Sequence, residues 1–164
     1  MRKLLLFLCS LIGWSPALAS GRAIMAQGSW AAIDRGTICE ALGRAARIAP
    51  KGKVQAVAGF TFSADRRRWG EFHAQLRRMP RPGATVMLRV GGQPFLLTAR
   101  GNIAWSSGPR DDQAIIAALR NAGGMSVEAR DMAGQRFVDD YAAEGAPTAI
   151  DAAAAACAGK MTPQ

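Results

Sequence analysis

Histidine is scarce in this sequence, since His73 is the only one among 164 residues. A zinc site needs three or four ligands and a Ser–His–Asp triad needs a histidine base, so either site would have to be built around His73. The G-x-S-x-G, P-loop and dinucleotide-binding glycine motifs are missing as well. His73 lies on the polar side of an alternating segment, which is typical of a solvent-exposed residue. We therefore expect no catalytic residues, no bound metal and no cofactor.

Long apolar runs are also scarce, and the only one lies at the start of the chain. Residues 1–19, "MRKLLLFLCSLIGWSPALA", combine a basic start at Arg2 and Lys3, an apolar run and a small-residue A-x-A exit. These are the three parts of a secretory signal peptide, with cleavage expected before Ser20. The run is too short to span a bilayer. The sequence thus predicts a periplasmic protein, with outer-membrane association or secretion as variants, and no transmembrane segment after cleavage.

Cysteine occurs only three times, and cleavage of the leader would remove Cys9. Cys39 and Cys157 would then be the only cysteines, and in an oxidising compartment they are expected to pair. Their bridge would close a loop of 157 − 39 = 118 residues. In the chain-entropy model such a bridge adds about 3–5 kcal/mol of stability. The alternative is two buried thiols.

Alternation of apolar and polar residues dominates the middle of the chain. It predicts strands at residues 54–62, 71–77 and 84–90, with shorter candidates at 29–34, 37–42, 94–99, 102–106, 125–130 and 136–141. Glycine- and proline-rich turns separate these segments. Many short, half-buried strands at close spacing indicate a mainly β, antiparallel sandwich-like protein. We expect one such domain over residues 20–160, followed by a short tail at 161–164.

Two segments break the alternation and predict short helices. Residues 108–124 carry acids near the start and two glycines at the end, as helix termini favour. In residues 145–160, Thr148 and Asp151 resemble a capping box. Ile150, Ala153 and Cys157 then share one face at helical spacing. We expect this alanine-rich C-terminal helix to lie flat on the sheet, with the disulfide tethering it.

Acidic residues are fewer than basic ones, 12 against 21, and the formal net charge is +9. Loss of Arg2 and Lys3 with the leader would leave 9 − 2 = +7. Arginines gather in two predicted turns: Arg66, Arg67 and Arg68 in one, and Arg77, Arg78 and Arg81 in the next. The turns flank one strand, which argues against a single patch. They form either a solvated basic surface or a site for anionic lipid, lipopolysaccharide or acidic glycan, because export makes nucleic acid an unsuitable partner.

Three residues are expected to have structural roles. Asp139 falls in phase with Phe137 and Tyr141, so it is predicted to be buried, while Asp140 faces the other way. A buried carboxylate needs a partner, for which the candidates are an arginine, such as Arg130 or Arg136, or backbone amides of the last helix. Tyr141 is expected in the core with its hydroxyl bonded to the backbone, and Trp30 is expected to anchor the core.

Between Trp30 and Cys157 the order of motifs resembles the invasion-associated locus B family. The matching segments are "TICEA" around Cys39, "VMLRVGGQPFLL", "DDQAIIAALRNAGGMSV" and "GQRFVDDYAAEGAPTAIDAAAAAC". The last is similar to the family pattern G-x-x-x-x-D-x-Y-x-L-x-G-x-x-x-A at Gly134, Asp139, Tyr141, Gly145 and Ala149, with Ala143 at the leucine position.

The resemblance implies an exported, virulence-associated β-rich protein linked to host-cell entry, with no agreed enzymatic mechanism. We therefore expect a non-enzymatic protein that binds envelope or host components. An envelope enzyme, or an enzyme inhibitor, with an unrecognised site is the alternative.

Overall fold

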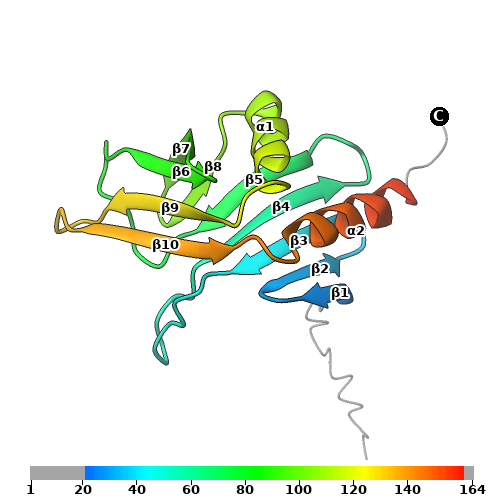
Figure 1. The fold of residues 1–164 in the computed structure, drawn as a ribbon, viewed down its shortest axis with the longest axis horizontal. Coiled ribbons are helices and arrows are strands. Elements are labelled where there is room, and N and C mark those ends of the chain that lie inside the picture. The colour runs from blue at the N-terminus through cyan, green and yellow to red at the C-terminus, as the bar shows by residue number, and fades with distance from the viewer. Residues whose placement is uncertain (1–20, 161–164) are drawn as a thin grey trace, which may run out of the picture.

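The computed structural model describes residues 21–160, so the predicted signal peptide (1–19) and tail (161–164) lie outside the described residues. The strands are β1 (Arg22–Gln27), β2 (Trp30–Asp34), β3 (Ile38–Arg44), β4 (Val57–Ser63), β5 (Trp69–Gln75), β6 (Val86–Val90), β7 (Gln93–Arg100), β8 (Ile103–Trp105), β9 (Gly124–Arg130) and β10 (Arg136–Ala142). The helices are α1 (Pro109–Leu119) and α2 (Ala146–Ala158). The predicted mainly β, antiparallel class with two helices is confirmed (Figure 1).

All neighbouring strands pair antiparallel in one sheet of order β1-β2-β3-β4-β5-β8-β7-β6-β9-β10. The strand β7 changes partners along its length: residues 93–97 pair with β6, and residues 98–100 pair with β8. A strand that switches partners in this way makes a corner between two halves of a sheet. The sheet therefore divides into one half around β1–β5 and β8 and another around β6, β9 and β10.

The two halves curl until β10 meets the far half of the sheet. The backbone N–H of Ala46, just after β3, donates to the carbonyl of Asp140 at 2.8 Å. The indole N–H of Trp30 in β2 donates to the carbonyl of Ala142 at 2.7 Å. One continuous core of buried side chains from both halves fills the space between them. This closed arrangement gives the predicted sandwich-like architecture.

Trp30 anchors the core, as predicted, and two glycine positions shape its surroundings. The ring of Trp30 stacks on Phe60, which meets Phe72 edge to face. Gly43 lies opposite Trp30 in β3, and a Cβ atom there would come within 2.7 Å of three indole ring atoms. Gly70 is the extra residue of a bulge between β4 and β5, with φ +79. A side chain at either glycine would displace a packed aromatic or aliphatic neighbour.

The helix α2 packs on β2 and β3 with a face of small side chains. Ala149, Ala153 and Cys157 are fully buried on that face, and Cys157 is disulfide-bonded to Cys39 of β3 across a Cα–Cα distance of 5.7 Å. The predicted pairing and the tethered C-terminal helix are thus confirmed.

The predicted capping box at the start of α2 is wrong. The helix begins at Ala146 after Gly145, which takes the left-handed conformation at φ 85, and no side chain caps it. Thr148 therefore lies inside the first turn. Asp151 instead accepts hydrogen bonds from Arg120, just after α1, at 2.6 and 3.2 Å.

Candidate anion-binding site

The two predicted arginine clusters lie at opposite ends of β5. Arg66, Arg67 and Arg68 occupy the turn between β4 and β5, whereas Arg77 and Arg78 follow the end of β5. A strand of seven residues is about 20 Å long, so the clusters cannot form one patch. Arg81 lines a different cavity from Arg77 and Arg78, together with Arg89, Arg130 and Glu128.

The turn that contains Arg66, Arg67 and Arg68 also holds a carboxylate. Asp65 accepts hydrogen bonds from the Ser63 hydroxyl at 2.6 Å and the Arg67 backbone at 3.1 Å, and both bonds lower the pKa of Asp65. The Arg67 guanidinium lies 3.6 Å from Asp65. The Arg66 guanidinium lies 5.2 Å from the centre of the Trp69 ring. A cavity of about 810 Å³ beside this turn is lined by Arg67 and Arg68 but also by Asp65.

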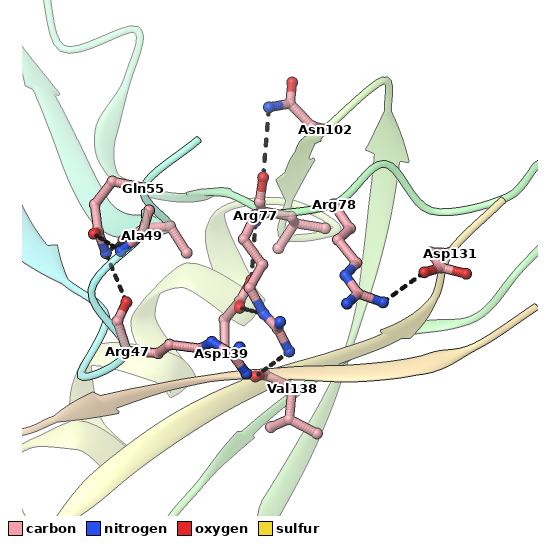
Figure 2. A network of polar contacts seen from close by, with 11 residues as sticks. Arg47, Ala49, Gln55, Arg77, Arg78, Asn102, Asp131, Val138 and Asp139 are labelled. Carbon is pink, nitrogen blue, oxygen red and sulfur yellow. Dashed lines mark hydrogen bonds and ion pairs between the residues drawn. The ribbon is translucent and has the colours of Figure 1, made fainter. Parts of the chain in front are cut away.

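Arg77 is committed to a buried ion pair. Its Nε donates to Oδ1 of Asp139 at 2.6 Å, its backbone N–H donates to Oδ2 at 3.1 Å, and its Nη2 donates to the carbonyl of Val138 at 3.2 Å (Figure 2). The Asp139 side chain is 1% exposed and that of Arg77 is 19% exposed. Burial raises the pKa of Asp139, and the hydrogen bonds and charge of Arg77 oppose that rise.

The buried, paired state expected for Asp139 is confirmed, and its partner is an arginine as expected, but it is Arg77 rather than Arg130 or Arg136. Arg136 pairs with Glu128 instead, and Arg130 donates to the carbonyl of Gly134. Because Asp139 compensates its charge, Arg77 is not the freely exposed polyanion contact that the sequence suggested. Its role is to join the end of β5 to β10.

A basic pocket of about 400 Å³ opens beside this ion pair. Four cationic side chains line it, Arg47, Lys53, Arg77 and Arg78, together with Ala49, Pro50, Val54 and Ala56. No carboxylate occurs among these lining residues. We call this cavity the basic pocket.

The loop between β3 and β4 brings two of the four cations to the basic pocket. The side-chain carbonyl of Gln55 accepts from the Ala49 N–H at 2.8 Å, and its amide donates to the Arg47 carbonyl at 3.2 Å. These bonds brace the loop, and the Arg47 side chain extends toward the Arg77–Asp139 pair (Figure 2).

Charge in the basic pocket is only partly compensated. Asp139 pairs with Arg77, and Asp131 pairs with Arg78 at 2.8 Å while leaving that side chain 42% exposed. Within residues 21–160, neither Arg47 nor Lys53 forms an ion pair. The pocket therefore holds two positive charges in excess of its neighbouring carboxylates, which favours an anionic ligand.

Arg47 and Lys53 were missed as site residues by the sequence reasoning. The basic run that contains them, "RIAPKGK", includes a proline and a glycine and is therefore typical of a turn. Nothing in this run indicates that its side chains lie beside the end of β5. Only the pairing of β3 with β4 and of β4 with β5 brings residues 47 and 53 next to residues 77 and 78.

His73 is half-buried rather than solvent-exposed as predicted. It lies between Gly59 and Trp105 of the neighbouring strands, and its Nδ1 is 3.4 Å from the hydroxyl of Thr61. Burial lowers the pKa of His73. Across residues 21–160, no group of three or more His, Cys, Asp or Glu side chains is placed to hold a metal ion.

Tyr141 lies in the core, 2% exposed, as expected. Its hydroxyl, however, has no hydrogen-bond partner among the described residues, so the expected bond to the backbone is wrong. Desolvation of this phenol raises its pKa far above the usual range.

These features define a curled antiparallel β protein with a disulfide-tethered helix and a basic pocket at one end. None of the helices within residues 21–160 has the length and apolar character needed to cross a bilayer. Comparison with models of known families, with curated proteins and with solved structures finds no match to this chain. The resemblance to the invasion-associated locus B family stays a prediction.

Proposed function

We propose that this chain is an exported, non-enzymatic protein of the bacterial envelope that binds anionic groups, as its resemblance to the invasion-associated locus B family also suggests. The observation that carries the proposal is the basic pocket, where four cations converge with no carboxylate in the lining. Lipid phosphates, lipopolysaccharide and acidic glycans present the complementary charge outside the cytoplasm.

Preorganisation supports this function. The loop that carries Arg47 is braced by Gln55, and Arg78 is held by Asp131 while its side chain stays 42% exposed. Cations that are fixed before binding lose less conformational entropy when an anion arrives. Arginine donors also match phosphate and carboxylate oxygens in geometry.

The turn containing Arg66, Arg67 and Arg68 is proposed as a second, weaker contact. All three side chains are exposed. Asp65 within the same turn repels an approaching anion and pairs with Arg67. The basic pocket is therefore expected to contribute more to binding than this turn.

The experiment compares two variants of the mature protein on immobilised heparin and on lipopolysaccharide. One is Arg47→Ala with Lys53→Ala, and the other is Arg66→Ala with Arg67→Ala and Arg68→Ala. Loss of two charge contacts should weaken binding about five- to thirtyfold, at roughly 0.5–1 kcal/mol per contact. The triple variant should lose less, although it removes more charge. Equal binding by wild type and the pocket variant would refute the proposal.

A further inference from the structure

Four large apolar side chains are exposed at one end of the molecule. They are Ile48 (59% exposed), Val54 (40%), Met79 (51%) and Met132 (62%). They belong to three loops: residues 45–56 between β3 and β4, 76–85 between β5 and β6, and 131–135 between β9 and β10. Single exposed apolar residues are ordinary, but a group of them on neighbouring loops indicates an interaction site.

Strand pairing places the three loops together. The strand β4 begins where β5 ends, because Val57 pairs with Gln75. Pro80, after β5, pairs with Asp131 at the end of β9, and Arg78 also bonds Asp131. Val54 and Arg78 line the same pocket. We call this end of the molecule, formed by the three loops, the loop end.

The same loops also carry exposed cationic side chains. Arg47, Lys51, Lys53 and Arg81 are all exposed on the same loops. The longest of the loops, residues 45–56, projects from the sheet (Figure 1). Ile48 precedes and Val54 follows Lys51 in this loop. Gln55 bonds the backbone of Arg47 and of Ala49, the two neighbours of Ile48. These bonds fix the backbone around Ile48 and keep its side chain exposed to solvent.

We propose that the loop end binds the surface of an anionic lipid bilayer. Ile48, Val54, Met79 and Met132 enter the boundary between headgroups and acyl chains, while the surrounding lysines and arginines contact lipid phosphates. Peripheral membrane binding draws on this combination of buried apolar area and attraction to anionic headgroups. A soluble acidic glycan would use the cations alone and leave the apolar side chains in water.

This inference rests on the proposed function and names an anionic lipid bilayer as the ligand. Its test uses vesicles of phosphatidylglycerol and phosphatidylcholine, vesicles of phosphatidylcholine alone, and soluble heparin. The apolar variant is Ile48→Ser with Met79→Ser, because neither side chain lines the basic pocket. Its matched control is Leu96→Ser with Ile24→Ser, which removes exposed apolar side chains from β7 and β1. Thermal unfolding of each variant confirms that it is folded.

Wild type should bind the anionic vesicles and not the phosphatidylcholine vesicles. The apolar variant should bind anionic vesicles about tenfold more weakly, because two apolar side chains that would enter the bilayer are lost. It should bind heparin as wild type does, because the lining of the basic pocket is unchanged. The control variant should match wild type on both. Equal vesicle binding by wild type and the apolar variant would overturn the inference.

The two proposals fail in different ways. Binding of wild type to heparin but not to anionic vesicles would refute the lipid inference and leave anion binding intact. Absence of binding to both would refute the proposed function as well. Insertion is checked with Ile48→Trp, whose added fluorescence should be quenched by brominated lipids; unquenched emission on bound vesicles contradicts insertion.

Discussion

At the scale of single residues, the contact between Arg77 and Asp139 has the largest expected effect on stability. Asp139 is almost fully buried, and Arg77 supplies two of its hydrogen bonds. Removing one member of a buried pair leaves the other charge without compensation, which costs more than the pair itself contributes.

Asp139→Asn should therefore lower the free energy of unfolding by about 2–4 kcal/mol, since the amide keeps the shape but not the charge. Chemical denaturation of wild type and variant measures this. Asp140→Asn is the control, because the neighbouring Asp140 is exposed and its variant should stay within about 0.5 kcal/mol of wild type. An Asp139 variant as stable as wild type would reopen a functional role for this carboxylate.

His73 gives a second residue-scale prediction, on pH. Burial lowers its folded pKa below the ordinary 6.5, and Arg68 acts in the same direction, while Glu40 and Glu71 oppose the shift. Between the folded pKa and 6.5 the unfolded chain binds more protons, so stability falls as pH drops through that window. His73→Gln should flatten the change in unfolding free energy between pH 7.5 and 5.5. The same slope in both proteins would show that other groups cause it.

Features of single residues were predictable from the sequence only where they depend on the alternation of inward and outward side chains along one strand. Alternation predicted that Asp139 and Tyr141 are buried and Asp140 is not. It could not supply the partner of Asp139, because Arg77 lies 62 positions away and meets it only after the sheet curls. The unbonded hydroxyl of Tyr141 likewise depends on which side chains the curl brings near it.

At the scale of secondary-structure elements, the helix α2 depends on its tether and its flat face. Its buried side chains are mostly alanine, which contribute little apolar area each. The Cys39–Cys157 bridge compensates by holding the helix against β3.

Replacing both cysteines by alanine should lower the unfolding free energy by about 3–5 kcal/mol in the chain-entropy model. Amide hydrogen exchange should quicken first in α2, where the tether acts, and later in β5, which is buried between neighbours. Mass spectrometry of the wild type, prepared without reductant, should find no free thiol at Cys39 or Cys157. Undiminished stability of the double variant, or free thiols in wild type, would contradict this account.

Element boundaries show the limits of local sequence signals. The strand predicted at residues 54–62 begins at Val57, because residues 45–56 form the loop that carries Arg47 and Lys53. The predicted capping box is wrong because α2 already begins after Gly145, which takes the left-handed conformation. Asp151 accepts a hydrogen bond from Arg120 instead. The strand β1 was not predicted, since its side chains are almost all exposed and give no alternation of burial.

At the scale of the whole molecule, the curl of the sheet builds the basic pocket. The strand switch at β7 turns the second half of the sheet so that β10 reaches Arg77 and Ala46. The same topology separates the basic pocket from the turn at Arg66, Arg67 and Arg68. The composition reveals the excess of positive charge. Only the topology shows that the basic residues lie at two opposite ends of β5 rather than in one patch.

Binding and stability should therefore respond differently to salt. Exposed charges interact over a screening length of about 10 Å at 0.1 M salt and about 3 Å at 1 M, so the protein should elute from heparin as salt rises. The Arg77–Asp139 pair is largely buried and the disulfide carries no charge, so neither is screened comparably. The melting temperature should consequently change little over a salt range that abolishes binding. Circular dichroism and heparin retention, measured at the same salt concentrations, test this. Retention that persists at 1 M salt, or unfolding in parallel with release, would show that binding does not depend on exposed charge.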